Sequence, residues 1–555
     1  MEQYQLSAKE KKFIGLHLFV AVFALTLGSM FGPLQALEHA GLDLYPFLKP
    51  LFKSYYQGLT LHGVLNALIW TTFFITGFLT LAVTFGLKRP LKYPKLNWVG
   101  FWTMVLGLVM AAVPLLLNQA SVLYTFYPPL QASWAFYLGL TLVVVGSWME
   151  GWGMMFTFRA WRKENPGVRS PFIALASVIN MVMWQLATLG VAVEILTMLL
   201  PWSLGLIEGV DPQLSRTYFW FTGHPLVYFW LLPAYVSWYG MLPKQVGGKL
   251  FSDSLARFSF WLFLLLSVPL GFHHQYVDPG VPAVWKFIHA LLTYSVFFPS
   301  LLTAFTVIAS LERAGRQNGG KGLFGWLTKL HWGDASVSGQ LLAGILFLFG
   351  GIGGLTNASY NINLVIHNTA WVPGHLHLTV ASAATLSFMG ISYWLLPYLS
   401  GKKLWDFKIF GIKASVLQTW IWFVGMAIFS NAMHVVGLLG APRRTPLGLA
   451  PYVPEEWSGH LLRVGIGGSI LGISGLIYIA IMIGTALSKK KLADDEQVQV
   501  PLAEAVHDPQ ETPDWLDKWV PWLIATLVLI LIAYGPQLID QISNMQLTSP
   551  GFKVW

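Results

Sequence analysis

The residues with the clearest chemical potential are histidines that lie inside long apolar stretches of the 555-residue chain. A side chain that can ionise is costly in such surroundings and marks a functional site by default. Imidazole is a common protein ligand of copper and iron. We therefore expect metal cofactors at six of the 14 histidines, namely His62, His224, His273, His274, His375 and His377.

The spacing of these histidines indicates how they divide into groups. His375 and His377 are two residues apart, so on a helix they point about 200° apart and can bind two different cofactors. His224 and Tyr228 are four residues apart and therefore share one helix face. The spacing predicts that the helix of His375 and His377 lies between two cofactor sites. It also predicts that Tyr228 lies beside the metal ligand His224.

The adjacent pair His273 and His274 requires a different local structure. Neighbouring residues on a helix point about 100° apart, so the two rings share one metal only if the backbone bends. Pro269 and Gly271 come just before the pair and supply a reason for a bend. We expect both rings to bind the same ion.

The elements that hold these residues are predicted to be membrane-spanning helices. Of the residues, 55% are hydrophobic and 11% are charged, whereas soluble domains carry about 25% charged residues. About thirteen apolar stretches are close to the length of roughly 20 residues that a helix needs to cross a bilayer. Helices are expected there because they satisfy their own backbone hydrogen bonds without water. We predict an all-α polytopic membrane bundle that forms a single domain over residues 1–555. The expected spans are 13–37, 56–86, 98–118, 132–160, 172–200, 214–241, 256–278, 285–310, 338–356, 369–397, 412–438, 461–487 and 519–539.

Basic residues predict the orientation of this bundle. Lysines precede the first span, and Lys or Arg recur in every second loop, at 88–95, 159–169, 244–257, 313–329, 402–413 and 489–491. The positive-inside rule places the N-terminus in the cytoplasm and, with about thirteen spans, the C-terminus outside. The six histidines then share one layer in the outer half of the membrane, on four helices. The net charge of +9 is accounted for by topology and predicts no nucleic-acid partner.

Three motifs resemble the metal-binding helices of heme-copper oxygen reductases, subunit I. They are GHPLVY at 223–228, FHHQ at 272–275 and HNTAWVPGHLH at 367–377. The resemblance covers nearly the whole chain and is closest to the B family, the cytochrome ba(3)-type oxidases. The segments YYQGLTLH at 55–62 and LYTFYPP at 123–129 are similar to that group too.

The resemblance implies two hemes in the outer half of the membrane. His62 and His377 would be the two axial ligands of a low-spin heme, expected to be heme b. His375 would be the proximal ligand of a high-spin heme of the A or O type. Axial ligands alone do not distinguish heme types, so these types rest on the resemblance.

The resemblance also implies one copper ion, copper B, which faces the high-spin heme. His224, His273 and His274 would bind it. Tyr228 would be covalently joined to His224 and would give an electron and a proton to oxygen. His224 and Tyr228 are therefore the expected catalytic residues. Leu226 stands where the A family has a glutamate, so the acidic relay of that family is missing.

Heme propionates are expected to meet four residues near the outer surface. Arg443 and Arg444 would pair with them, because a guanidinium group matches a carboxylate with two hydrogen bonds. His367 and Asn363 belong to the same region. B-family members often carry an aspartate where this chain has Asn363, so a proton-loading role that needs an ionisable group there is in question.

Protons must reach the oxygen site from the cytoplasm. Tyr235 and Tyr239 follow Tyr228 at 7 and 11 residues, which is helical spacing along one side. Hydroxyl groups and waters in line can pass protons where charged groups would be costly. Together with the resemblance to the single proton path of the B family, this predicts a path through Tyr235, Tyr239, Ser252, Ser300 and Thr303.

The resemblance implies a terminal respiratory oxidase of a bacterial or archaeal plasma membrane that reduces O₂ to water, coupled to proton uptake and pumping. Cytochrome c would be the electron donor. A partner subunit II would carry a binuclear copper centre, since this chain has no cysteine. A small single-helix subunit and membrane lipid complete the expected partners. The alternatives are a quinol oxidase or nitric oxide reductase of the same superfamily, and a secondary transporter, whose span number is similar.

Overall fold

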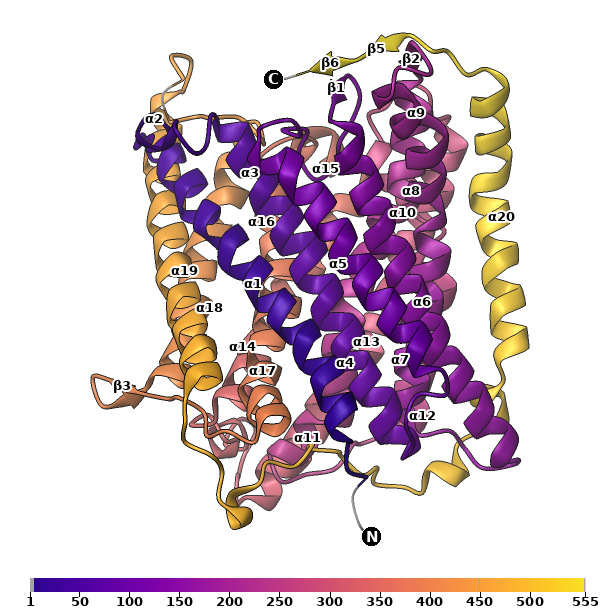
Figure 1. Cartoon of the computed structure of the whole chain (residues 1–555), viewed down its shortest axis with the longest axis vertical. Helices are drawn as coiled ribbons and strands as arrows, with labels where there is room; N and C mark the ends of the chain where they lie inside the picture. The colour runs from indigo at the N-terminus through magenta and orange to yellow at the C-terminus, as the bar shows by residue number, and fades with distance from the viewer. Residues whose placement is uncertain (1–3, 449, 554) are drawn as a thin grey trace.

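The long helices of the chain run side by side in one bundle (Figure 1). The computed structural model describes residues 4–448, 450–553 and 555. In this part of the chain, ten helical runs are long and apolar enough to cross a membrane. They are α1 (Ala8–His39), α3 to α4 (Tyr55–Leu87), α5 (Pro94–Leu116), α7 to α9 (Phe172–Ser203), α13 (Ala283–Gln317), α14 (Ala335–Ala358), α16 to α17 (Trp371–Ser400), α18 (Ala414–Leu438), α19 (Glu455–Leu487) and α20 (Trp519–Ser543).

The other three predicted spans are helical as well. They correspond to α6 (Trp134–Glu164), α10 (Pro212–Gly240) and α12 (Asp253–Ser267). The all-α prediction is therefore confirmed. The number of thirteen spans stays a prediction, since ten of the described helical runs meet the length and hydropathy of a span. The span expected over 256–278 is too long, because α12 already ends at Ser267.

Short elements close the two ends of the bundle. At one end, β1 (Leu130–Gln131) pairs with β6 (Phe552–Lys553), and β2 (Gly209–Val210) pairs with β5 (Ser549–Pro550) (Figure 1). The C-terminal segment thereby ties two loops together at that end, whereas α1 begins at the opposite end. The remaining short elements are α2 (Tyr45–Leu48), α11 (Leu242–Gln245), α15 (Tyr360–Ile366), β3 (Lys408–Ile409) and β4 (Ile412–Lys413).

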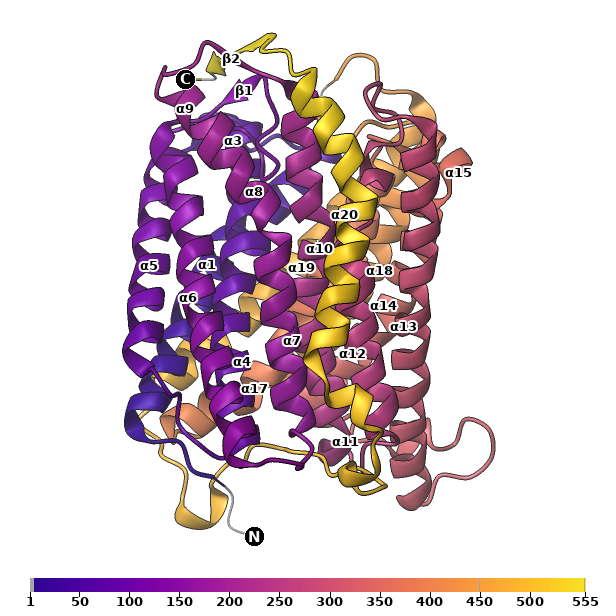
Figure 2. The ribbon, with the colours of Figure 1, turned by 90° about the vertical axis from the view of Figure 1, so that its right-hand side faces the viewer.

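The outer surface of the bundle is apolar. Helix α20 lies on the outside, against α10, α12 and α13 (Figure 2). Its Leu531 and Ile539 are 67% and 68% exposed. Exposed apolar side chains at these positions are unfavourable in water and favourable in lipid, so the structure agrees with a multi-pass membrane protein.

Two π-helical segments interrupt the spans that carry predicted metal ligands. Residues Val64–Trp70 form one between α3 (Tyr55–Gly63) and α4 (Thr71–Leu87). Residues His377–Ala384 form another between α16 (Trp371–Leu376) and α17 (Thr385–Ser400). A π-helical turn inserts a residue and changes the direction of the side chains around it, and such turns are frequent at functional sites.

A buried polar pair joins α1 to α6. His17 Nε2 lies 2.9 Å from Glu150 Oε1, and both side chains are fully buried. The other ring nitrogen of His17 lies 2.9 Å from Phe13 O, and Asn97 of α5 donates to Glu150 O at 3.1 Å. A β-carbon on Gly77 of α4 would lie 2.7 Å from His17 Cβ. Four helices therefore meet at this pair.

Replacing His17 with Phe should destabilise the protein by about 1–3 kcal/mol, because Glu150 would stay buried without its hydrogen-bond partner. The double variant His17→Phe/Glu150→Leu should regain most of the loss, since both polar groups are gone. Thermal unfolding of the detergent-purified protein measures this. Equal midpoints for the single and double variants would show that the two side chains do not interact.

Candidate functional site

The six histidines predicted to bind metals line two cavities, of about 270 and 160 Å³. His62 and His377 line the larger one, here called the paired-histidine cavity. The other four line the smaller one, which His367 also lines, and it is here called the four-histidine cavity after the four predicted ligands. Trp230, Leu376 and Val380 line both cavities, so that the helix of His377 forms part of a common wall.

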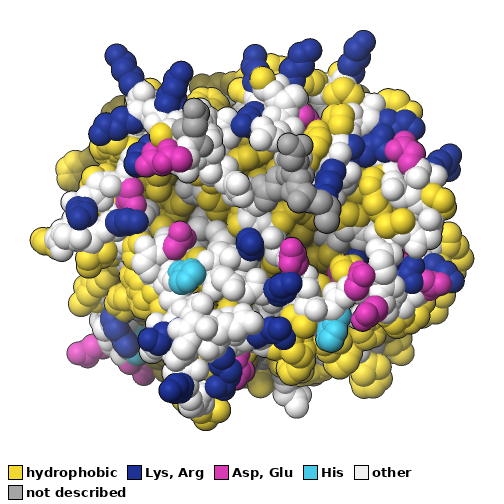
Figure 3. Space-filling model, turned by 90° about the horizontal axis from the view of Figure 1, so that it is seen from below, with side chains coloured by type: hydrophobic (Ala, Val, Ile, Leu, Met, Phe, Trp, Pro, Cys, Tyr) yellow, Lys and Arg dark blue, Asp and Glu magenta, His cyan; other side chains and the backbone are white. Residues whose placement is uncertain are grey.

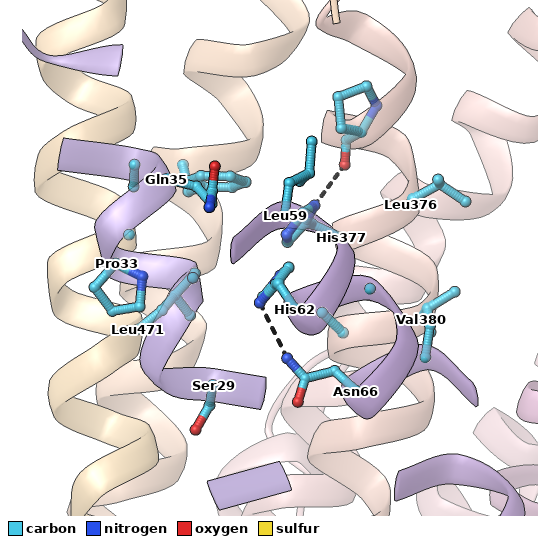
Figure 4. Close-up of a pocket in the computed structure, with 18 of the residues that line it drawn as sticks. Ser29, Pro33, Gln35, Leu59, His62, Asn66, Leu376, His377, Val380 and Leu471 are labelled. Carbon is cyan, nitrogen blue, oxygen red and sulfur yellow. Dashed lines mark hydrogen bonds between the residues drawn. The ribbon is translucent and has the colours of Figure 1, made fainter. Parts of the chain in front are cut away.

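The imidazole rings of His62 and His377 face one another in the paired-histidine cavity (Figure 4). Their ring centres are 6.3 Å apart, and the ring planes differ by 13°. Two metal–imidazole bonds of about 2 Å each account for most of this separation, and the rest is the distance from each ring centre to its nitrogen. The pair therefore fits one metal ion held between two axial imidazoles.

Hydrogen bonds orient both of these rings. His62 Nδ1 lies 3.1 Å from Gly28 O and 3.1 Å from Asn66 Nδ2 (Figure 4). His377 Nδ1 donates to Pro373 O at 2.7 Å. A ring held through Nδ1 keeps Nε2 free for a metal, which is the usual arrangement of metal-binding histidines. Sequence reasoning missed Asn66, although it lies one turn after His62 on the same helix.

Three imidazoles gather closely in the four-histidine cavity. One nitrogen from each of His224, His273 and His274 lies within 4.8 Å of the others. His224 Nδ1 is 3.1 Å from His274 Nε2. The bend predicted before the adjacent pair is present, since both rings lie on a 3₁₀ turn, Gly271–Gln275, beyond the end of α12. Three neutral imidazoles around one point are a suitable ligand set for copper or zinc.

Neighbouring side chains hold this three-histidine cluster in place. His273 Nδ1 lies 2.7 Å from Leu270 O and 3.0 Å from Thr293 Oγ1 of α13. The ring of His274 stacks on Trp220, with 3.8 Å between ring centres and 8° between planes. These contacts fix the rings before any ion binds, which lowers the entropy lost on metal binding.

His375 lines the four-histidine cavity from the common wall, whereas His377, two residues further, lines the other cavity. The ring of His375 stacks against Trp371, with 5.9 Å between ring centres. A β-carbon on Gly353 of α14 would lie 2.8 Å from His375 Nδ1, so only glycine leaves room for this ring. His375 can therefore offer a single axial nitrogen to a cofactor that faces the three-histidine cluster.

Tyr228 lies beside the cluster on α10. Its ring centre is 5.3 Å from that of His224, and it lines the same cavity. His224 Nε2 is buried and has no hydrogen-bond partner among the described residues, whereas Nδ1 faces His274. A bond from this Nε2 to the tyrosine would therefore leave Nδ1 to the metal.

Two arginines lie at the cavities, and some of their guanidinium nitrogens have no hydrogen-bond partner among the described residues. Arg443 lines both cavities, and Arg444 lines the paired-histidine cavity. Arg443 Nη2 donates to Asn368 Oδ1 at 2.7 Å, but Arg443 Nε and Arg444 Nη2 are buried without a partner in the described part of the chain. Burial and the adjacent Arg444 lower the pKa of Arg443 to about 10. Such an arrangement fits cofactors that bring their own carboxylates.

Asn363 lies near the arginines and contacts the ring of His367. Asn363 Oδ1 lies 3.2 Å from His367 Nδ1, and Asn363 Nδ2 donates to Asn357 O at 2.8 Å. His367 Nε2 is buried and unpaired among the described residues. Burial and the nearby Arg443 lower the pKa of His367 to about 4, so the ring is neutral near pH 7. The asparagine therefore orients a neutral imidazole at the rim of the four-histidine cavity.

Two of the predicted proton-path residues lie close together on α10, and one of them bonds to a residue that sequence reasoning missed. Tyr235 and Tyr239 are fully buried on α10, with 6.5 Å between ring centres. Tyr239 OH donates to Ser259 Oγ of α12 at 3.3 Å. The ring of Phe263 lies 5.6 Å from those of both Tyr228 and Tyr235. The signal for Ser259 is its helical spacing along α12, but many buried hydroxyl groups share it.

Of the other three predicted path residues, Ser300 lies against Tyr235 and Thr303 against Tyr239, whereas Ser252 lies apart from both tyrosines. Ser252 is the N-cap of α12, where its hydroxyl accepts from Leu255 N at 3.2 Å. Ser300 lines the four-histidine cavity. Thr303 is buried, and its hydroxyl donates to Pro299 O at 2.8 Å. Ser300 thus lies next to the metal cluster, whereas the hydroxyl of Ser252 is committed to a helix end.

Known proteins resemble this chain over most of its length. Residues 12–470 match the family model described as Cytochrome C and Quinol oxidase polypeptide I. The chain is 44% identical over 552 residues to cytochrome c oxidase subunit 1 of Thermus thermophilus, covering 98% of this chain and 97% of the relative. It is 25% identical over 451 residues to cytochrome c oxidase polypeptide 1 of Halobacterium salinarum, covering 77% of this chain and 70% of that relative. A solved heme-copper terminal oxidase dimer superposes with a TM-score of 0.91 at 39% identity, covering 99% and 96% of the two chains.

The three-histidine cluster should bind one transition-metal ion per chain. Substituting His273→Leu should remove most of that ion, because two imidazoles remain where three are needed. Thr293→Val should weaken metal binding about 10–100-fold, since it deletes a partner of His273 Nδ1. Metal content is measured by plasma mass spectrometry, with His331→Leu at an exposed loop position as the control. Unchanged metal content in His273→Leu would show that the cluster is not the metal site.

Proposed function

The chain belongs to the cytochrome c and quinol oxidase polypeptide I family, and from this premise we propose that it is the catalytic subunit of a terminal oxidase that reduces O₂ to water. The observation that carries the proposal is the common wall between the two cavities. One cavity holds paired imidazoles, and the other holds three imidazoles together with His375. In this proposal the 555 residues form one membrane-embedded domain. The transporter alternative is set aside by family membership.

The two cavities fit two hemes and one copper ion. His62 and His377 would hold a low-spin heme, for which we propose heme b, and His375 would hold a high-spin heme of the A or O type. The three-histidine cluster would hold copper B. When bound, the low-spin heme carries electrons, and the high-spin heme together with copper supplies the reduction of oxygen. The unpaired buried nitrogens of Arg443 and Arg444 support carboxylates of the hemes at this place.

The protein itself supplies protons and orientation to the oxygen site. We assign to Tyr228 the role of holding a proton and an electron at its phenolic oxygen, next to His224. The hydroxyls of Tyr235, Tyr239 and Ser259 lie further along α10 and α12 and can pass protons where charged groups would be costly. Ser252, Ser300 and Thr303 complete the proposed path and connect it to the end of the bundle that holds the N-terminus.

The proposed orientation of the bundle in the membrane rests on the distribution of charge, and the proposed partner subunit rests on the absence of cysteine. Lys and Arg side chains gather on the end of the bundle at which α1 begins (Figure 3), which supports a cytoplasmic N-terminus and an outer C-terminus in a bacterial or archaeal plasma membrane. With no cysteine in the chain, a binuclear copper centre would reside on a partner subunit II. Cytochrome c is the proposed electron donor, and a small single-helix subunit the further proposed partner.

Oxygen uptake by the purified complex tests this function. Reduced cytochrome c should sustain faster uptake than a quinol does. Tyr228→Phe should lower the rate by at least about 10²-fold, because it deletes the hydroxyl that gives a proton at the oxygen site. Both heme spectra should remain. Tyr360→Phe is the matched control, since Tyr360 is 44% exposed on α15.

Three results would count against parts of this proposal. A colourless protein would exclude any heme enzyme. Faster uptake with a quinol would favour the quinol oxidase alternative. Full activity in Tyr228→Phe would remove the tyrosine from the chemistry and favour the nitric oxide reductase alternative, since those enzymes resemble this chain but lack that tyrosine.

A further inference from the structure

The loop that carries Arg443 and Arg444 is fastened to its neighbours on two flanks. This loop, residues 441–448, follows α18 and is here called the arginine loop. On one flank it pairs with the segment before α16, where Ala370 N donates to Ala441 O at 2.8 Å and Arg443 N donates to Asn368 O at 2.9 Å. On this flank the arginine loop is therefore bonded to the segment that leads into the helix of His375 and His377.

The other flank is fastened by a buried carboxylate of α1. Glu38 is 2% exposed, and its Oε1 accepts from Gly448 N at 3.1 Å. Leu447, the preceding loop residue, is fully buried. The end of the arginine loop is therefore held by a hydrogen bond to the carboxyl group of a helix that lines the paired-histidine cavity.

The contact is also a close approach of two backbones. A β-carbon on Gly448 would lie 1.6 Å from Glu38 O and 2.6 Å from Gly41 N. Gly41 itself has a φ of +87°, which favours glycine. The loop and the end of α1 therefore fit together only because both carry glycine here, and the position of one determines the position of the other.

Nothing in the packing alone requires an acid at this position. Burying a carboxylate is unfavourable unless its oxygens are bonded. Glu38 Oε2 is buried without a hydrogen-bond partner among the described residues and lies 3.5 Å from His39 Nδ1. An apolar residue would avoid this cost but would leave Gly448 N–H without its acceptor. The hydrogen bond to the loop is thus the interaction that accounts for the acid.

We propose that Glu38 is a positioning residue that holds the arginine loop over the paired-histidine cavity and so sets the midpoint potential of the low-spin heme. The inference rests on the proposed function, because it requires a heme between His62 and His377. A guanidinium near a heme stabilises the reduced form, which carries one more negative charge. If the loop loosens, the arginines move away on average, and the midpoint potential falls.

The sign of the shift separates this role from a direct electrostatic effect. Any negative charge on Glu38 repels the reduced heme, so deleting that charge would by itself raise the midpoint potential. Loosening the arginine loop lowers the potential instead. Glu38→Ala removes both the charge and the acceptor, whereas Glu38→Gln removes the charge but keeps an oxygen that can accept from Gly448 N.

A redox titration of the low-spin heme in the purified, intact complex tests the proposal. We expect Glu38→Ala to lower the midpoint potential by about 59 mV, a tenfold change in the ratio of oxidised to reduced heme. Glu38→Gln should stay at the wild-type value or above it. The control is Glu456→Ala, which removes the same charge from an exposed position at the start of α19, and it should leave the potential unchanged.

Each outcome decides whether Glu38 acts by positioning the arginine loop or only through its own charge. An unchanged or raised potential in Glu38→Ala overturns the proposal, as does an equal fall in Glu38→Gln. If Glu38→Ala does not assemble with heme, Glu38→Asp decides instead, because it keeps the charge but shortens the reach to Gly448; a fall supports the proposal, and an unchanged potential overturns it. A wild-type protein without a low-spin heme contradicts the proposed function itself, which is a distinct result.

Discussion

The position of two imidazoles on one helix is the constraint on which the rest of the structure depends. His375 and His377 are two residues apart, yet they line different cavities. Helix α3 must therefore bring His62 to one side of this helix, while α10 and the 3₁₀ turn bring three imidazoles to the other. The π-helical turns beside both ligands of the paired-histidine cavity, and the glycine of α14 next to His375, provide the room and the direction that this requires.

The pattern of satisfied and unsatisfied nitrogens follows from the same constraint. Polar groups are costly in an apolar interior, so most find partners. The chain supplies those partners at Nδ1 of His62, His273 and His377. It supplies none, among the described residues, for His224 Nε2 or Arg443 Nε. These two nitrogens belong to side chains that line the four-histidine cavity, where bound groups and the tyrosine bond would complete the hydrogen bonding.

Much of this site could be predicted from the sequence, because depth in the membrane and helical spacing follow from chain order. The division of the histidines between two cavities and the all-α bundle are features that could be predicted in this way. The polar partners are different. The bond from Gly448 to Glu38 joins positions 410 residues apart, and Ser259 is one hydroxyl among many in apolar spans. The expected span 256–278 was too long because hydropathy records apolar length, not the break at Pro269.

The central claim is that one helix separates a cofactor with two axial imidazoles from a second cofactor that faces a three-histidine metal site. The amounts of heme and copper in the purified protein test this most directly, with heme measured as the pyridine complex and copper by plasma mass spectrometry. The account predicts two hemes per chain, one of them low-spin and six-coordinate, and one copper ion beyond those of the proposed partner subunit II. A single heme per chain, or two hemes without copper at the histidine cluster, would contradict it.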